Sequence, residues 1–123
     1  MLKGVQFYKN LEHFQSQLKK KKLNVSEAKL AEYDQLLAHI EVPKIAKVSS
    51  HKHELKRHPQ GHHNGWRCDH IKGLKRCLSG MNDFYQAQSA GIYGWRCQMC
   101  DFDLCMRCMK AEKYIEQILE RED

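Results

Sequence analysis

The sequence predicts a small α+β fold that is stabilised by bound metal, with a helical hairpin before it and a helix after it. Three observations lead to this prediction. Residues 49–110 contain all six cysteines but few long aliphatic side chains. The segments on either side instead carry apolar residues at helical spacing. A small region so poor in core-forming residues would be marginal alone, whereas a structural metal site contributes on the order of 10 kcal/mol or more.

The N-terminal segment, residues 1–47, is predicted to fold as an antiparallel helical hairpin that acts as a docking element. Its first helix spans residues 5–23 and ends in the run Lys19–Lys22, because positive charge is favourable at a helix C-terminus. Four apolar side chains of this helix share one face. They are Phe7, Leu11, Phe14 and Leu18.

The second predicted helix begins at Asn24, with Glu27 three residues later as its capping-box partner. Pro43 ends it. Its apolar stripe consists of Leu30, Tyr33, Leu37 and Ile40. Two short helices bury little surface against each other, so we expect at least one stripe to pack on the metal region or on a partner chain.

The metal region, residues 48–110, is marked by two cysteine pairs. They are Cys97-Gln98-Met99-Cys100 and Cys105-Met106-Arg107-Cys108. Each Cys-x-x-Cys turn points two thiolates at one point, whereas tetrahedral zinc needs four donors. The segment Asp101–Leu104 between the pairs is too short to bring all four thiols to one ion easily. Each pair therefore supplies half of a site, and two interleaved zinc sites are expected.

Upstream residues supply the other halves. His51 and His53 share one side of an extended segment, because residues i and i+2 share a face of a strand. The first predicted site is therefore His51, His53, Cys97 and Cys100. The second site begins with Cys68, because Gly65-Trp66-Arg67-Cys68 repeats Gly94-Trp95-Arg96-Cys97. Its other predicted cysteines are Cys105 and Cys108.

The repeat leaves the fourth ligand of the second site open. The position where the partner of Cys68 belongs is Ile71, while His70 is adjacent to it and Cys77 lies further along. We favour His70, because an imidazole reaches further than a thiolate and a Cys-x-His pair can replace Cys-x-x-Cys. Cys77 is the alternative ligand; otherwise it is a small buried thiol, a common role for cysteine.

Two further segments complete the chain. Residues 78–94 contain turn-forming glycines together with apolar side chains, so a docked hairpin is expected rather than a free loop. Residues 109–123 predict a C-terminal helix, and its acidic part covers residues 111–123. A helix directly after Cys-x-x-Cys is typical of a treble-clef zinc knuckle.

These motifs together resemble the divergent cysteine/histidine-rich zinc fingers, which are related to the ZZ-type and diacylglycerol-binding-type fingers. The most specific part is the string Cys100-Asp101-Phe102-Asp103-Leu104-Cys105 with Cys108. The resemblance covers residues 51–110 and implies two zinc ions in a cross-braced, treble-clef-like module that serves recognition or scaffolding. Ile71 departs from the pattern. The lipid-binding loops of the family are not recognisable, so lipid binding is not carried over.

The cysteines could instead form disulfides, but their spacing and the His-x-His favour metal. With no secretory signal and no stretch that approaches a membrane span, we expect an intracellular, reducing compartment. The formal net charge of +6 suits solubility, an acidic protein surface, RNA or anionic lipid. No catalytic zinc motif is present, and closed sites are expected, so the chain is not expected to be an enzyme.

The leading prediction is a non-catalytic zinc-binding structural or protein-interaction subunit of a large multiprotein assembly. Such an assembly could be respiratory or otherwise organellar, or cytoskeletal or ciliary. Two alternatives remain. One is contact with RNA or DNA, with Trp66 and Trp95 as stacking platforms. The other is a ubiquitin-ligase-like adaptor, because cross-braced zinc modules also recruit conjugating enzymes.

Overall fold

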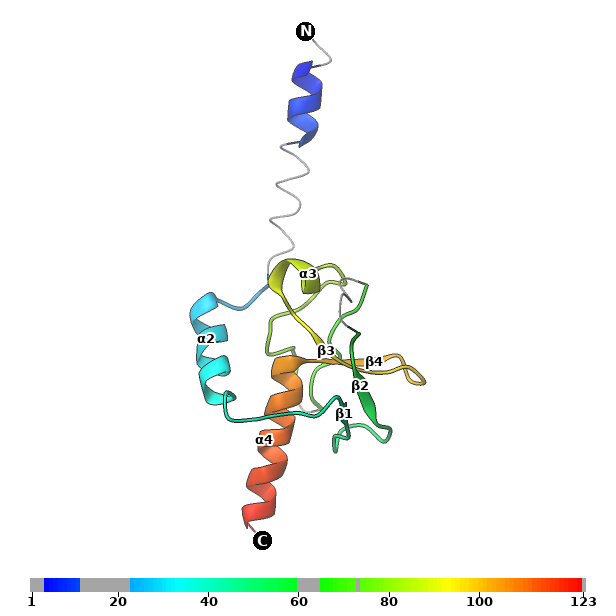
Figure 1. The fold of residues 1–123 in the computed structure, drawn as a ribbon. Helices are drawn as coiled ribbons and strands as arrows, with labels where there is room; N and C mark the ends of the chain where they lie inside the picture. The colour runs from blue at the N-terminus through cyan, green and yellow to red at the C-terminus, as the bar shows by residue number, and fades with distance from the viewer. Residues whose placement is uncertain (1–3, 12–22, 60–64, 73, 123) are drawn as a thin grey trace.

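The computed structural model describes residues 4–11, 23–59, 65–72 and 74–122, and these residues form a small α+β protein (Figure 1). Residues 4–11 are helical. The other helices are α2 (Glu27–Leu36), α3 (Gln86–Ala90) and α4 (Met106–Glu122). The strands are β1 (Ile45–Ala46), β2 (Leu55–Arg57), β3 (Gly94–Cys97) and β4 (Phe102–Cys105). Phe14, Leu18, Lys19–Lys22, His62 and His63 lie outside the described residues.

The sheet has the order β1-β2-β3-β4, and each neighbouring pair is antiparallel. Successive strand residues point to opposite faces, so one face carries Leu55, Trp95 and Leu104 into the core, where each is at most 2% exposed. The other face carries Lys56 opposite Arg96. One side of the sheet is therefore mainly apolar, and the other carries charged side chains, of which Asp103 is buried.

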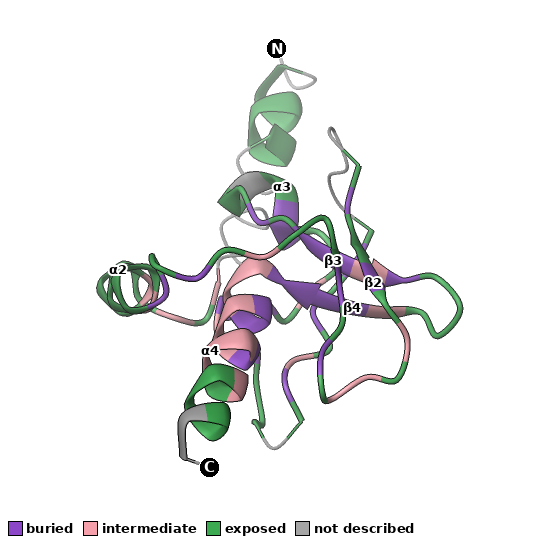
Figure 2. Ribbon diagram, turned by 60° about the horizontal axis from the view of Figure 1, so that its bottom comes forward, coloured by how far each residue is buried: buried purple, intermediate pink, exposed green. Residues whose placement is uncertain are grey.

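Cysteines make up much of the core, as the composition predicted. The cluster of buried residues includes Cys68, Cys77, Cys97, Cys105 and Cys108 beside the aromatic and aliphatic side chains. Figure 2 shows this burial concentrated in β3, β4 and the first turns of α4. The core is thus built around thiols rather than around a large set of leucines and isoleucines.

Helix α4 follows β4 without a loop and begins three residues before the predicted start at 109. Its Glu112 is buried, and one carboxylate oxygen accepts hydrogen bonds from the Ser50 N–H at 2.8 Å and the Ser49 hydroxyl at 3.2 Å. The other oxygen accepts from the Ser50 hydroxyl at 2.8 Å. These bonds attach the segment that leads to His51 onto α4.

The predicted cap of the second helix is wrong. Ser26 is the N-cap of α2, and its hydroxyl accepts a hydrogen bond from the Lys29 N–H at 3.2 Å. The Asn24 N–H instead donates to the carbonyl of Gly80 at 3.1 Å. A tertiary contact therefore holds Asn24 outside the helix, and the next good capping residue takes its place.

The predicted antiparallel hairpin does not form between the described parts of the two N-terminal helices. Figures 1 and 2 show the helix of residues 4–11 well separated from α2. Its Phe7 is 62% exposed and its Leu11 is 43% exposed, so the described part of this apolar stripe is largely open to solvent. The stripe of the second helix is partly used, because Leu37 and Ile40 are buried beyond the end of α2.

Residues 78–94 contain a short helix, α3, rather than the predicted hairpin. The buried amide of Gln86 accepts hydrogen bonds from the N–H groups of Asn82 at 2.7 Å and Asp83 at 2.9 Å, which closes a turn before the helix. Gly91 ends α3 in the left-handed conformation at φ 65. The expected docking does occur, since Met81 and Ile92 are buried in the core.

Candidate metal centres

Two groups of side chains each bring four metal-ligand atoms within 4.8 Å of one another. The first group is His51, His53, Cys97 and Cys100. The second group is Cys68, Cys77, Cys105 and Cys108. Tetrahedral zinc would separate two sulfurs by about 3.8 Å and a nitrogen from a sulfur by about 3.6 Å, given its usual bond lengths. Both groups therefore have the dimensions of a tetrahedral metal site.

The first group lies at the turn between β3 and β4. Cys97 ends β3 and Cys100 lies in the turn, while His53 approaches from the segment before β2. The Nδ1 atom of His53 is 3.2 Å from the sulfur of Cys100 and 3.7 Å from that of Cys97. These separations bracket the nitrogen–sulfur edge of a zinc tetrahedron.

His51 supplies an independent sign that the first group binds an ion. Its Nε2 atom is buried and has no hydrogen-bond partner among the described residues. A buried polar nitrogen left unpaired costs free energy, and coordination to a metal would remove that cost. The ring is held in place by stacking on Phe102, with ring centroids 4.3 Å apart.

The second group lies where β4 meets α4. Cys105 ends the strand and Cys108 sits in the first turn of the helix. The sulfur of Cys77 is 3.4 Å from that of Cys105 and 4.0 Å from that of Cys108. All four side chains are buried. Among the described residues, this group is therefore enclosed by protein and shielded from solvent.

Backbone N–H groups point at the sulfurs of the second group. The Cys105 N–H donates to the sulfur of Cys68 at 3.3 Å, and the Leu78 N–H donates to that of Cys108 at 3.3 Å. The hydroxyl of Ser79 lies 3.3 Å from the sulfur of Cys105. Such donors orient metal-bound thiolates and offset their negative charge.

The thiols of the second group differ in pKa. Burial opposes ionisation of Cys105, but hydrogen bonds from the Cys108, Cys68 and Cys77 thiols outweigh it and lower its pKa well below 9.0. The hydrogen bond with Cys105 is the main reason that the pKa of Cys68 is raised. One ionised thiol, that of Cys105, is therefore stabilised by neighbours that stay protonated. Four thiolates in the same place would repel one another unless a cation lay among them.

The structure brings Cys77, not His70, to the second group, which corrects the preference for His70. The segment between Cys68 and Cys77 folds back through a turn in which the Leu74 N–H donates to the Ile71 carbonyl at 3.0 Å. Ile71 itself is buried in the core. The repeat predicted the partner of Cys68 at or beside residue 71. The turn instead brings Cys77 next to Cys68, Cys105 and Cys108.

His70 serves the second group through its backbone. Its N–H donates to the sulfur of Cys68 at 3.3 Å, and its φ of 51 places it in the left-handed region that few side chains adopt. The Nδ1 atom of its ring lies 3.3 Å from the Ile71 carbonyl oxygen. The imidazole is thus turned to the backbone, while the amide points at the thiolate.

The two groups interleave along the chain, as the cysteine pairing predicted. Counted from the N-terminus, the first and third donor pairs make the first group, and the second and fourth pairs make the second. Strand β4 runs from one group to the other, because Cys100 precedes it and Cys105 ends it. The same strand therefore positions Cys105 of the second group and the turn that carries Cys100 of the first.

A buried charged network lies between the groups, and the sequence analysis missed it. Asp103 of β4 lies opposite Arg96 of β3, and its carboxylate accepts a hydrogen bond from the Arg96 guanidinium at 2.7 Å. Its other oxygen lies 3.0 Å from Nε2 of His58. Its backbone pairs with Asp69, whose carboxylate accepts from the Asp103 N–H at 2.7 Å. Burial raises the pKa of Asp69.

Both tryptophans of the repeat are buried. Trp66 is 3% exposed and its ring meets His58 edge-on with centroids 4.4 Å apart. Trp95 is 2% exposed, and its indole N–H donates to the Pro43 carbonyl at 2.9 Å. Neither ring offers a face on which a nucleic-acid base could stack. Both rings are part of the core that also contains the donor cysteines.

Comparison with known proteins gives no relative: no family model matches the chain, and no similar curated protein or solved structure was found. The fold and the two donor groups therefore define the class by themselves. The chain is a small α+β protein with two Cys/His groups that could each hold a metal ion. Among the helices of the described residues, none has the length and apolar character needed to cross a membrane.

Proposed function

We propose that this chain is a non-catalytic zinc module of the divergent Cys/His-rich finger kind, and that it serves as a structural or protein-interaction subunit of a multiprotein assembly. Zinc is favoured because thiolate and imidazole donors in a tetrahedron of this size suit that ion. A Cys-x-x-Cys at a strand turn and another at a helix start also support a cross-braced, treble-clef-like arrangement.

One observation carries the non-catalytic part of the proposal. Each group offers four protein donors, which fill a tetrahedral zinc site and leave no position for water or substrate. Catalytic zinc, by contrast, keeps such a position open. The thiols are free of disulfides, which suits a reducing intracellular compartment. An organellar or a cytoskeletal assembly would both fit.

The interaction part rests on apolar side chains exposed on helices at both ends of the molecule. Phe7, Tyr8 and Leu11 are 43–68% exposed on the helix of residues 4–11. Ile115, Ile118 and Leu119 are 37–58% exposed on α4. Contiguous apolar patches of this kind mark docking surfaces more often than free surface. The metal module would then hold α4 as a rigid base, because its first turn carries Cys108.

The first experiment measures metal. Elemental analysis of the zinc-loaded chain should give two zinc ions per chain, and removal of the zinc should unfold residues 49–110 in hydrogen exchange. Stoichiometric disulfides among Cys97, Cys100, Cys105 and Cys108 would contradict a zinc module. A site that keeps bound water, detected in the spectrum of the cobalt-substituted chain, would contradict a closed one.

The second experiment measures interaction. The zinc-loaded chain is used as bait with and without the substitutions Phe7→Asp and Leu11→Asp, which leave both donor groups intact. A partner that is captured by the parent chain, lost with the double variant and lost on chelation would support the proposal. Capture that is indifferent to both changes would contradict it.

A further inference from the structure

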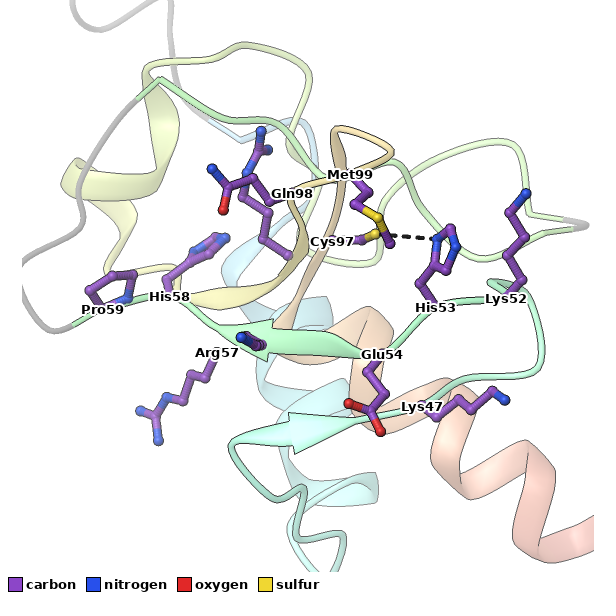
Figure 3. A pocket seen from close by; sticks show the side chains of 12 residues that line it. Lys47, Lys52, His53, Glu54, Arg57, His58, Pro59, Cys97, Gln98 and Met99 are labelled. Atoms are coloured by element: carbon purple, nitrogen blue, oxygen red, sulfur yellow. Dashed lines mark hydrogen bonds between the residues drawn. The ribbon is translucent and has the colours of Figure 1, made fainter.

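A groove of about 770 Å³ lies beside the first donor group, whose His53 and Cys97 form part of its lining. It runs along the charged side of β2 and under the turn that follows β3 (Figure 3). Its lining includes Lys47, Lys52, Lys56, Glu54 and Met99. The floor is therefore a strand held by the metal site, and the rim is the turn that carries Cys100.

The groove carries an excess of positive charge. Arg57 and Arg96 also line it, but Arg57 stacks over the Tyr93 ring at 4.5 Å and Arg96 is bound to Asp101 and Asp103. The remaining cations are Lys47, Lys52 and Lys56, which are all exposed. Within the described ranges, no ion pair neutralises them, and Glu54 is the groove's one carboxylate. An anionic ligand would meet three free ammonium groups.

The groove also offers an apolar contact, which favours a peptide over nucleic acid. Met99 is 78% exposed at the rim, where its thioether can cover an apolar side chain. Both tryptophans that could have stacked bases are buried. The ligand that fits is a peptide segment with carboxylates and exposed aliphatic side chains next to each other.

The chain itself contains such a segment at the end of α4. Its aliphatic side chains recur at i, i+3 and i+4 on one face, as Ile115, Ile118 and Leu119, and all three are exposed. Two of its acids are engaged within the chain, since Glu112 binds Ser49 and Ser50 and Glu116 binds the Ser49 N–H and Lys113. The last four residues remain, and there Glu120, Glu122 and Asp123 outnumber Arg121. This segment complements the groove in both charge and apolar surface.

The segment cannot reach the groove of its own chain. Helix α4 is continuous from Met106 to Glu122, its first turn carries Cys108, and Glu112 is bound to Ser49 and Ser50. Figure 1 shows its C-terminal end projecting away from the sheet. A second copy of the chain must therefore supply it.

We propose that the groove binds the acidic C-terminal helix of a second copy of this chain. If two copies exchange helices reciprocally, the contact closes as a two-fold dimer, which is the commonest symmetry of homo-oligomers. This homotypic contact goes beyond the proposed interaction function and does not depend on any other partner. It should weaken with added salt, because exposed charges are screened.

The test measures binding of a fluorescein-labelled peptide of residues 111–123 to the zinc-loaded full chain, together with the association state by sedimentation. We expect the parent chain to bind the peptide and to self-associate. The variant Lys52→Glu/Lys56→Glu should weaken peptide binding by about ten-fold or more. The control Lys72→Glu/Lys75→Glu makes the same change in net charge at exposed positions outside the groove, and it should bind like the parent.

The reciprocal variant tests the helix without touching the groove. Glu120→Lys in the full chain should reduce self-association, and pairing it with Lys56→Glu should restore part of the loss. Every variant must retain two zinc ions, which separates a lost contact from a lost fold. If the Lys52→Glu/Lys56→Glu chain fails that check, the Glu120→Lys chain alone decides.

Three results would overturn the proposal. The first is a parent chain that is monomeric and does not bind the peptide, which contradicts the proposed contact directly. A scrambled peptide of the same composition that binds equally well shows that the groove takes any acidic segment. A short single-stranded RNA that displaces the peptide with higher affinity assigns the groove to nucleic acid. In each case, unchanged zinc content and unchanged partner capture would leave the proposed function intact.

Discussion

The two donor groups offer the same number of ligands in opposite surroundings. The first group holds the exposed Cys100, the half-buried His51 and His53, and the buried Cys97, at the turn between β3 and β4. The second group holds four buried thiols between β4, α4 and the segment 68–77. The four donors of each group indicate that it can bind a metal ion. The burial around each group determines how much stability the chain loses when that ion is removed.

The difference is one of desolvation. Loss of an ion from the first group leaves the exposed Cys100 and the half-buried His53 within reach of water, while Cys97 and Nε2 of His51 stay buried. Loss from the second group leaves four crowded thiols with backbone donors aimed at their sulfurs and no solvent to replace the cation. We therefore expect the first group to exchange its metal readily and the second to be required for folding.

The largest expected effect comes from removing a ligand of the second group. Cys105→Ser should abolish folding of residues 49–110, because a structural zinc site contributes on the order of 10 kcal/mol and the core around it is small. Cys100→Ser is the matched change in the first group, and it should lose one zinc yet keep the sheet. Circular dichroism and zinc content measure both. Equal unfolding of the two variants would erase the distinction between the groups.

The next effect separates the two candidates for the fourth ligand. Cys77→Ser should remove the second zinc and destabilise the chain severely. His70→Ala should keep two zinc ions and change the free energy of unfolding by about 1 kcal/mol or less. Alanine retains the backbone N–H that donates to the sulfur of Cys68. Elemental analysis with denaturant titration measures the pair. The opposite pattern would return the ligand role to His70.

A third prediction concerns the order of metal loss. Titration with a chelator should release zinc in two steps, with the first group emptied before the second. The exposed sulfur of Cys100 gives the chelator an entry point that the second group lacks. A zinc-release dye follows the steps, and hydrogen exchange of β4 reports whether the fold survives the first. Release of both ions in one step would show that the groups act as a single site.

The smallest expected effect lies in the network between the groups. Asp103→Asn should cost about 1–3 kcal/mol, because it weakens buried hydrogen bonds to Arg96 and His58. Asp101→Asn removes a carboxylate that also binds Arg96 but is 86% exposed, so it should change stability little. Thermal unfolding of the zinc-loaded variants compares them. If Asp101→Asn proves the costlier change, the buried network does not support the sheet.

The sequence predicted the donors wherever a simple repeat set their geometry. His51 and His53 follow the period of an extended segment, and Cys97 with Cys100 follows the Cys-x-x-Cys spacing, so the first group could be written down in full. Cys77 could not, because the irregular path between it and Cys68 depends on the single turn closed by Leu74 and Ile71. Periodicity says nothing about such a path.

The remaining misses also involve tertiary contacts. Asn24 and Ser26 are both good capping residues, and the bond from Asn24 to Gly80 decides between them. Asp103 is one of two aspartates in the most specific motif, but its role depends on the register that places it opposite Arg96. Register is a property of paired strands and cannot be read from either strand alone.

The continuity from β3 through β4 into α4 has a consequence for how this chain can vary. Each residue of β4 alternates between the core and the charged face, so inserting one residue would turn every later side chain to the wrong side. Cys105 would leave its group, and α4 would start with Cys108 rotated away from the ion. Substitutions along Phe102–Cys105 are therefore tolerable one by one, but its length is fixed. The described residues between Ile71 and Cys77 are exposed and lie outside the core, so this stretch can absorb insertions that β4 cannot.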